Sequence, residues 1–144
     1  IKELESDIKS TGFYSNKAAH IKSACSQIIE RFGGSVPQNI EDLTSLPGVG
    51  RKTANVVLGS AFGRPAIACD THVIRLSRRL RLSESSDPVK LEFALMEIVP
   101  EKAWTLFSHL LIFHGRNTCK ARMPDCSDCV ISKHCPAADN KDLW

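Results

Sequence analysis

The sequence predicts an all-α protein built as two helical lobes. Apolar residues recur at three- and four-residue spacing along most of the 144 residues, and no alternating apolar stretch of strand length is present. The Gly33-Gly34 pair and the Gly63-Arg64-Pro65 segment interrupt this helical pattern. We therefore expect a lobe over residues 1–64 and a second lobe over residues 65–144.

Each predicted helix follows from its capping residues and breaks. Ser15, Asp70 and Asp87 precede apolar-periodic segments and are predicted N-caps, with Pro88 at the first helical position after Asp87. Gly33 is expected to end the first helix. The predicted helices cover residues 15–32, 40–46, 51–62, 71–80, 89–99 and 103–115. Residues 66–69 are apolar and lead into Asp70.

Composition and charge narrow the possible functions. The net charge of +3 and the pI of about 8.6 permit a polyanionic partner. No apolar run reaches the ~20 residues of a membrane-spanning helix. The chain has 6 Phe, 2 Trp and 1 Tyr, too few for a base-stacking sheet of the RNA-binding kind. The charged first ten residues argue against a secretory leader.

Four of the six cysteines form a C-terminal cluster with the spacing Cys119-x6-Cys126-x2-Cys129-x5-Cys135. Four thiolates can hold either tetrahedral zinc or a [4Fe–4S] cluster. Zinc ribbons usually present two C-x2-C pairs, whereas only one such pair is present here, which favours the iron–sulfur cluster. Two disulfides are a third alternative, disfavoured because secreted disulfide scaffolds scatter their cysteines. Cys25 and Cys69 lie in apolar contexts and are predicted to be small buried side chains.

Basic residues accompany the cysteines, with Lys120 and Arg122 inside the first Cys-to-Cys loop. An ordered cluster would fix this loop and aim the two side chains, which would suit contacts with phosphates. Equally, these charges could only solvate the loop and offset the negative charge of the cluster.

A glycine-rich turn joins two predicted helices at Leu46-Pro47-Gly48-Val49-Gly50. Glycine permits positive φ and close approach of another molecule, and the following helix N-terminus offers unpaired N–H groups to a phosphate. Gly48, Val49, Gly50 and Arg51 are therefore candidate residues for binding a phosphate. Lys52 lies in the first helical turn, where the helix dipole and Arg51 disfavour a positive charge. A partly buried amine there would suit Schiff-base chemistry, although most lysines are simply exposed surface residues.

Three motifs together resemble the endonuclease III family of the helix–hairpin–helix DNA glycosylases. They are Leu46-Pro-Gly-Val-Gly-Arg-Lys52-Thr-Ala-Asn, the segment Asp70-Thr-His-Val, and the four-cysteine loop over residues 119–135. The match extends from about Thr11 to Cys135. It implies a helix–hairpin–helix DNA glycosylase fold with a partial six-helix barrel and a [4Fe–4S] cluster held by the four cysteines.

The resemblance also implies roles for individual residues. Lys52 matches the family's nucleophile and Asp70 its catalytic carboxylate, although an aspartate before a helix is also an ordinary N-cap. For Asp70 we favour electrostatic stabilisation over proton abstraction. Phe13 falls where the family places an apolar residue that wedges into the DNA stack, and packing into the local core is the alternative. His72 is expected to bond within its helix.

The implied activity is that of a bifunctional DNA glycosylase and AP lyase of base excision repair. Its partner would be double-stranded DNA containing oxidised pyrimidines or abasic sites, with no membrane association. The alternatives are a non-catalytic DNA-binding module and a mismatch glycosylase, but adenine-mismatch glycosylases generally lack the lysine at position 52. The family places further helices upstream of Ile1. With them we expect a monomer, acting in the cytoplasm or nucleoid of a prokaryote or in the nucleus or mitochondrion of a eukaryote.

Overall fold

The computed structural model describes residues 1–144, which form α-helices and short 3-10 helices without β-strands. The α-helices are α1 (Lys2–Asp7), α2 (Tyr14–Phe32), α3 (Ile40–Thr44), α4 (Arg51–Ala61), α5 (Thr71–Arg79), α6 (Pro88–Ile98) and α7 (Trp104–Asn117). The 3-10 helices are η1 (Lys9–Thr11), η2 (Glu101–Ala103), η3 (Ser132–His134) and η4 (Lys141–Leu143). The predicted all-α class is confirmed, and α1 is a helix that the sequence pattern did not reveal.

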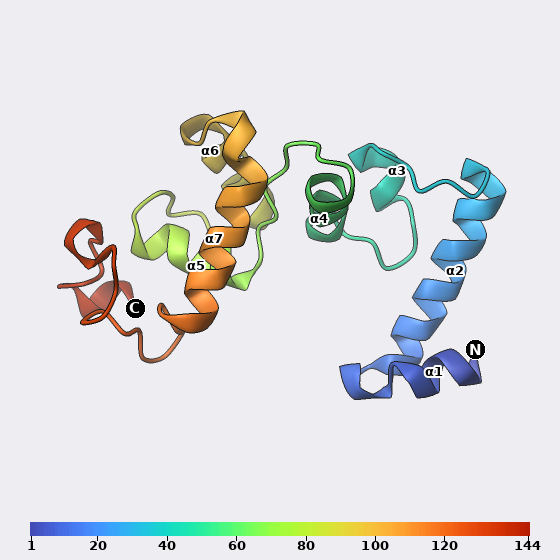
Figure 1. Cartoon of the computed structure of the whole chain (residues 1–144), viewed down its shortest axis with the longest axis horizontal. Helices are drawn as coiled ribbons and strands as arrows, with labels where there is room; N and C mark the ends of the chain where they lie inside the picture. The colour runs from blue at the N-terminus through green and yellow to red at the C-terminus, as the bar shows by residue number, and fades with distance from the viewer.

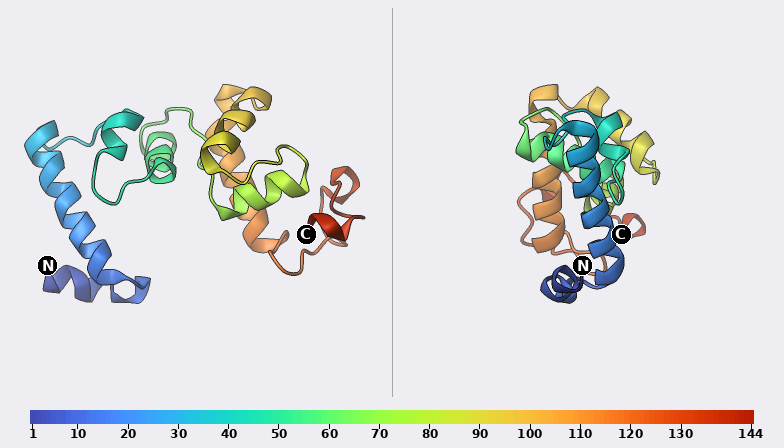
Figure 2. Two further views of the ribbon diagram at one scale, coloured as in Figure 1. Left: turned by 180° about the vertical axis from the view of Figure 1, so that it is seen from behind. Right: turned by 90° about the vertical axis from the view of Figure 1, so that its right-hand side faces the viewer.

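The helices are arranged in an elongated shape (Figure 1). The helices α3 and α4 occupy the middle, with α1 and α2 at one end and α5, α6 and α7 at the other. Seen from behind, α2 and α7 descend on opposite sides of this middle pair (Figure 2). The N-terminal helices and the cysteine loop therefore lie at opposite ends of the molecule.

Two separate apolar clusters hold the helices together. The larger cluster joins α5, α6 and α7 around Val73, Leu91 and Leu111. The smaller one joins α3 and α4 around Leu43 and Leu58 and includes Ala66. Two cores favour the predicted division near Pro65, which stays a prediction, although Ala66 crosses that boundary.

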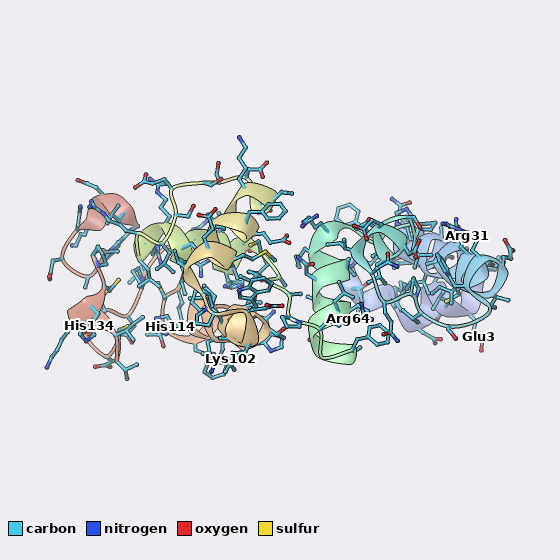
Figure 3. All side chains as sticks on the ribbon, turned by 90° about the horizontal axis from the view of Figure 1, so that it is seen from above. Glu3, Arg31, Arg64, Lys102, His114 and His134 are labelled. Atoms are coloured by element: carbon cyan, nitrogen blue, oxygen red, sulfur yellow. The ribbon has the colours of Figure 1, made fainter.

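The segment between the two clusters is buried although it has no regular structure. Ile67 is completely buried, and its carbonyl accepts a hydrogen bond of 2.8 Å from Asn55 Nδ2 of α4. On the other side, the N–H of Ala68 donates to Ser108 Oγ of α7 at 3.1 Å. In the side-chain view, Arg64 lies where the chain passes between the two parts (Figure 3). Side chains thus supply the hydrogen bonds that this buried backbone requires.

The helix α2 is an exposed arm. Ala18 is its only buried residue, while Ile21 and Ile29 are 43% and 68% exposed. Cys25 is exposed, so the prediction that it is buried was wrong: α2 buries only Ala18. Ser15 is not a cap either, because α2 already begins at Tyr14 with Phe13 as its N-cap. Gly33, with φ of 60°, ends α2 as predicted.

None of the helices combines the length and apolar character that crossing a bilayer demands.

Candidate DNA-binding and catalytic site

The glycine turn presents the first turn of α4 at the surface. The N–H of Val49 donates to the Leu46 carbonyl at 3.1 Å, which closes the turn. Gly48 has φ of 75°, and a Cβ there would lie 2.8 Å from His20 Cβ of α2, so both conformation and space require glycine. Gly50 is the N-cap and has no side chain to bond the first-turn amides of α4. These free donors suit a phosphate, as the sequence predicts.

Lys52 lies in this first turn with an exposed side chain that makes no hydrogen bond or ion pair within the protein. Partial burial of its amine, the condition set out from the sequence, is therefore not observed. Lys52 nevertheless lines a small cavity together with Cys69 and with Glu92 of α6. The fold thus brings the hairpin lysine next to the residue that precedes Asp70.

Asp70 caps α5 through a single carboxylate oxygen. Its Oδ1 accepts hydrogen bonds from the N–H groups of His72 and Val73 at 2.8 and 2.9 Å, which confirms the predicted N-cap. No protein group donates to Oδ2, and the side chain is only half-buried. Capping therefore leaves one carboxylate oxygen available to a ligand, so the structural and the catalytic interpretations of Asp70 are compatible.

Arg51 forms the only ion pair of the chain. Its Nε and Nη2 donate to the two carboxylate oxygens of Glu92 on α6 at 2.7 and 2.8 Å. Glu92 is 3% exposed, and hydrogen bonding to it is the main cause that raises the pKa of Arg51. Two of the three guanidinium nitrogens of Arg51 thus bind Glu92. Only the third, Nη1, is left for the DNA contact of Arg51, which stays a prediction.

Cys69 lies beside this ion pair and is buried, as predicted. Burial, followed by the nearby charges of Glu92 and Asp70, raises the pKa of its thiol to about 12. A thiol with this pKa is protonated and unreactive at neutral pH.

The four C-terminal cysteines line one cavity at the far end of the second lobe, together with apolar side chains such as Leu76 and Ile131. All four are free thiols. Burial first, and then its three cysteine neighbours, raise the pKa of Cys126. No three His, Cys, Asp or Glu side chains are placed closely enough to hold a single metal ion.

Two arginines of α5 hold the backbone that leads into this cavity, and the buried Arg79 also lines the cavity. Arg79 is 2% exposed and donates to Cys119 Sγ at 3.2 Å and to the carbonyls of Lys120 and Ala121 at 2.7 and 2.8 Å. One turn earlier, Arg75 donates to the Gly115 and Cys119 carbonyls, both at 2.9 Å. Burial, and then the neighbouring Arg79, lower the pKa of Arg75. Neither arginine has a carboxylate partner.

The imidazole of His114 completes this side of the cavity. Its Nε2 lies 3.6 Å from Cys129 Sγ, and burial lowers its pKa, which favours the neutral ring. Figure 3 shows His114 and His134 at the C-terminal end, far from Glu3 and Arg31.

The remaining candidate DNA contacts lie at the surface. Lys120 and Arg122 are exposed, on a backbone that Arg79 holds in place. Phe13 is 86% exposed and has φ of 49°, so the alternative in which it packs into a local core is not observed. His72 Nδ1 lies 3.2 Å from Arg75 Nη2, which confirms that His72 bonds within its helix.

Three residues of the site were missed at the level of sequence: Arg75, Arg79 and Glu92. Each is a charge embedded in an apolar-periodic helix. The spacing of Arg75 and Arg79 by four residues, on the side of α5 that carries Leu76, is a signal that could have identified the two arginines.

Comparisons with known proteins agree with this arrangement. Residues 1–101 match the family model described as HhH-GPD superfamily base excision DNA repair protein. Endonuclease III of Synechocystis sp. is 51% identical over 137 residues, which are 94% of this chain and 63% of that protein.

Solved structures give the same result. The structure of a non-covalent endonuclease III–DNA complex superposes with a TM-score of 0.91 at 44% identity, covering 99% of this chain and 67% of that one. The structure of a trapped endonuclease III–DNA covalent intermediate also gives 0.91, at 45% identity and with 98% and 67% covered.

The chain spans 62 to 68% of the length of the curated endonuclease III relatives that it matches. Over that span the hairpin, the aspartate N-cap and the cysteine loop occur together in the fold that those relatives share. The chain is therefore a member of the endonuclease III family, within the HhH-GPD superfamily of base excision DNA repair proteins.

Proposed function

We propose that this chain acts in base excision repair as a DNA glycosylase with AP lyase activity toward oxidised pyrimidines and abasic sites. The observation that carries the proposal is the position of Lys52, an unpaired amine on the first turn of α4, across a shared cavity from the segment that ends in Asp70. A structure of a related endonuclease III contains a covalent intermediate with DNA, which supports a covalent route.

In the proposed reaction, the neutral amine of Lys52 attacks the sugar C1′ of the damaged nucleotide. The bond from C1′ to the base breaks, and the base leaves with the electron pair and takes up a proton. Positive charge develops on the sugar during this step, and the open Oδ2 of Asp70 is the group that would stabilise it. Ring opening then gives an imine between Lys52 Nζ and C1′.

The imine permits cleavage of the strand. Loss of a proton from C2′ and departure of the phosphate from C3′ complete a β-elimination, and water then hydrolyses the imine and frees Lys52. Electrons balance without an oxidant or a reductant.

The cysteine cavity fits a [4Fe–4S] cluster held by Cys119, Cys126, Cys129 and Cys135. Such a cluster bound by four thiolates is negatively charged, and the cavity is lined by the buried guanidinium of Arg79, which lacks any carboxylate partner. When bound, the cluster would cross-link the loop over residues 119–135, which presents Lys120 and Arg122 to DNA phosphates.

Borohydride trapping tests the proposed function, because it reduces the imine to a stable secondary amine. On a duplex with one abasic site, the wild-type protein should form a covalent adduct, and Lys52→Gln should form none while its Kd for the duplex stays unchanged. Lys17→Gln is the matched control: Lys17 is also exposed, but it lies on α2 and its amine donates to the Thr11 carbonyl. A wild-type protein that binds DNA without adduct would favour the non-catalytic binding module.

A further inference from the structure

The helix α4 is attached to the second lobe at both of its ends. At its last turn, a Cβ on Gly59 would lie 2.7 Å from Thr105 Oγ1 of α7, and Ser60 Oγ lies 3.5 Å from His109 Nε2. At its first turn, the Arg51–Glu92 ion pair ties it to α6. These contacts differ in kind, since the last turn meets α7 through close packing and the first turn is joined to α6 by charge.

The ion pair has the geometry of a rigid connection. Both oxygens of Glu92 are occupied by the fork of one guanidinium, and the ring of Phe93 lies 5.2 Å from Arg51 Cζ. Bidentate pairing fixes orientation as well as distance, which a lysine could not do. Because Glu92 is almost fully buried and has no other donor, Arg51 is the only group that can satisfy it.

Lys52 is the next residue along α4, and it shares a cavity with Arg51, Cys69 and Glu92. Asp70 follows Cys69 directly on the other lobe. The ion pair therefore lines the same cavity as Lys52 and as Cys69, the residue before Asp70, and the Lys52 side chain has no hydrogen bond or ion pair of its own that would locate it.

We propose that Arg51 and Glu92 are positioning residues, which hold the first turn of α4, and with it the amine of Lys52, in register with Asp70 across the two lobes. This inference rests on the proposed function. It assigns Glu92 a role although its side chain, buried on α6, cannot touch DNA. It also assigns Arg51 a role other than phosphate binding.

The test measures two quantities separately: the rate of imine formation at saturating abasic duplex, and the Kd with its dependence on salt. Glu92→Gln and Arg51→Gln should each slow imine formation by roughly tenfold to a hundredfold, as expected for misplaced reacting groups. Kd and its salt slope should not change in Glu92→Gln. The exchanged pair, Arg51→Glu with Glu92→Arg, should recover part of the rate. Ser60→Ala, at the other end of α4, should keep the wild-type rate.

Two results would overturn the proposal. If Arg51→Gln weakens binding and lowers the salt slope while Glu92→Gln keeps the wild-type rate, Arg51 is a phosphate contact instead. If both variants lower the melting temperature but keep the rate of imine formation, the pair is merely structural.

A second measurement is independent of activity. Amide hydrogen exchange of residues 54–58 should rise in Glu92→Gln and not in Ser60→Ala. Unchanged hydrogen exchange in Glu92→Gln would overturn the positioning role. This result does not depend on adduct formation, so a wild type that formed no adduct would contradict only the proposed function.

Discussion

The guanidinium of Arg79 donates a hydrogen bond of 3.2 Å to the sulfur of Cys119, joining α5 to the first cysteine of the C-terminal loop. The same side chain holds two loop carbonyls and is 2% exposed. One buried cation thus organises both a sulfur of the proposed cluster and the backbone from which Lys120 and Arg122 project.

Replacing Arg79 should therefore destabilise the cysteine loop. In Arg79→Met, two carbonyls and a sulfur lose their donor inside the protein, at about 1–3 kcal/mol for each buried group left unsatisfied. We expect a lower iron content after purification and faster loss of visible absorbance in air. Arg78→Met is the matched control, because Arg78 is the exposed neighbour on α5 and makes no hydrogen bond. Equal iron retention in both variants would contradict the role given to Arg79.

Asp70→Asn separates the charge of Asp70 from its capping function. Asparagine caps helices about as well as aspartate, so the free energy of unfolding should change by less than about 0.5 kcal/mol. The rate of base release should nevertheless fall by about 10²-fold or more if the carboxylate stabilises positive charge on the sugar. Single-turnover kinetics on a duplex with one oxidised pyrimidine measure this rate.

Asp87 supplies the control for capping, because its Oδ1 accepts from the N–H groups of Val89 and Lys90 at 2.9 and 2.8 Å in the same geometry. Asp70→Ala and Asp87→Ala should each lower the free energy of unfolding by about 1 kcal/mol. Only Asp70→Ala should slow base release. If both variants slowed base release equally, the role of Asp70 would be helix capping alone.

The fold and much of this site follow from local patterns, and the failures have definite causes. The aspartate caps and the end of α2 at Gly33 were predictable because each depends on a few adjacent residues. The partners of Arg51, Arg75 and Arg79 were not, because they lie about forty residues away along the chain, on α6, near the end of α7 and in the cysteine loop. The exposure of Cys25 was likewise unpredictable, since the apolar residues around it suggest a buried face, whereas α2 buries only Ala18.

Cys69 should make stability depend on alkaline pH. Because burial raises its pKa to about 12, the folded protein keeps the thiol proton at pH values where the unfolded chain, with a pKa near 9, has lost it. The contribution of Cys69 to the free energy of unfolding is therefore complete below about pH 9. It declines toward pH 12, by up to about 4 kcal/mol for the full pKa shift. Denaturant titrations at several pH values should show a decline that is smaller in Cys69→Ala.

The thiols of Cys25 and Cys69 should differ in their reactivity toward alkylating reagents. At pH 8, iodoacetamide should modify the exposed Cys25 readily and leave Cys69 unmodified in the folded protein, as peptide mass analysis can establish. Modification of Cys69 at a rate like that of Cys25 would contradict the environment described for Cys69.

Lys120 and Arg122 should contribute to DNA affinity without contributing to sequence preference. Each Lys120→Ala or Arg122→Ala substitution should weaken binding to all duplexes alike and reduce the slope of log K against log salt by about 1, because phosphate contacts release counterions. Lys2→Ala, at the opposite end of the molecule, is a charge-matched control and should leave the slope unchanged. If neither substitution changed the slope, Lys120 and Arg122 would only solvate the loop and would not contact DNA phosphates.

Phe13 offers the clearest separation of binding from stability. Its ring is 86% exposed, so Phe13→Ala removes almost no buried apolar surface, and the free energy of unfolding should change by less than about 0.5 kcal/mol. If the ring enters the DNA stack and offsets part of the unstacking energy, the variant should bind a duplex with a damaged base more weakly and release that base more slowly. Single-stranded DNA requires no such insertion, and its binding should be unaltered. Equal effects on single-stranded and duplex substrates would show that Phe13 contacts the backbone rather than the stack.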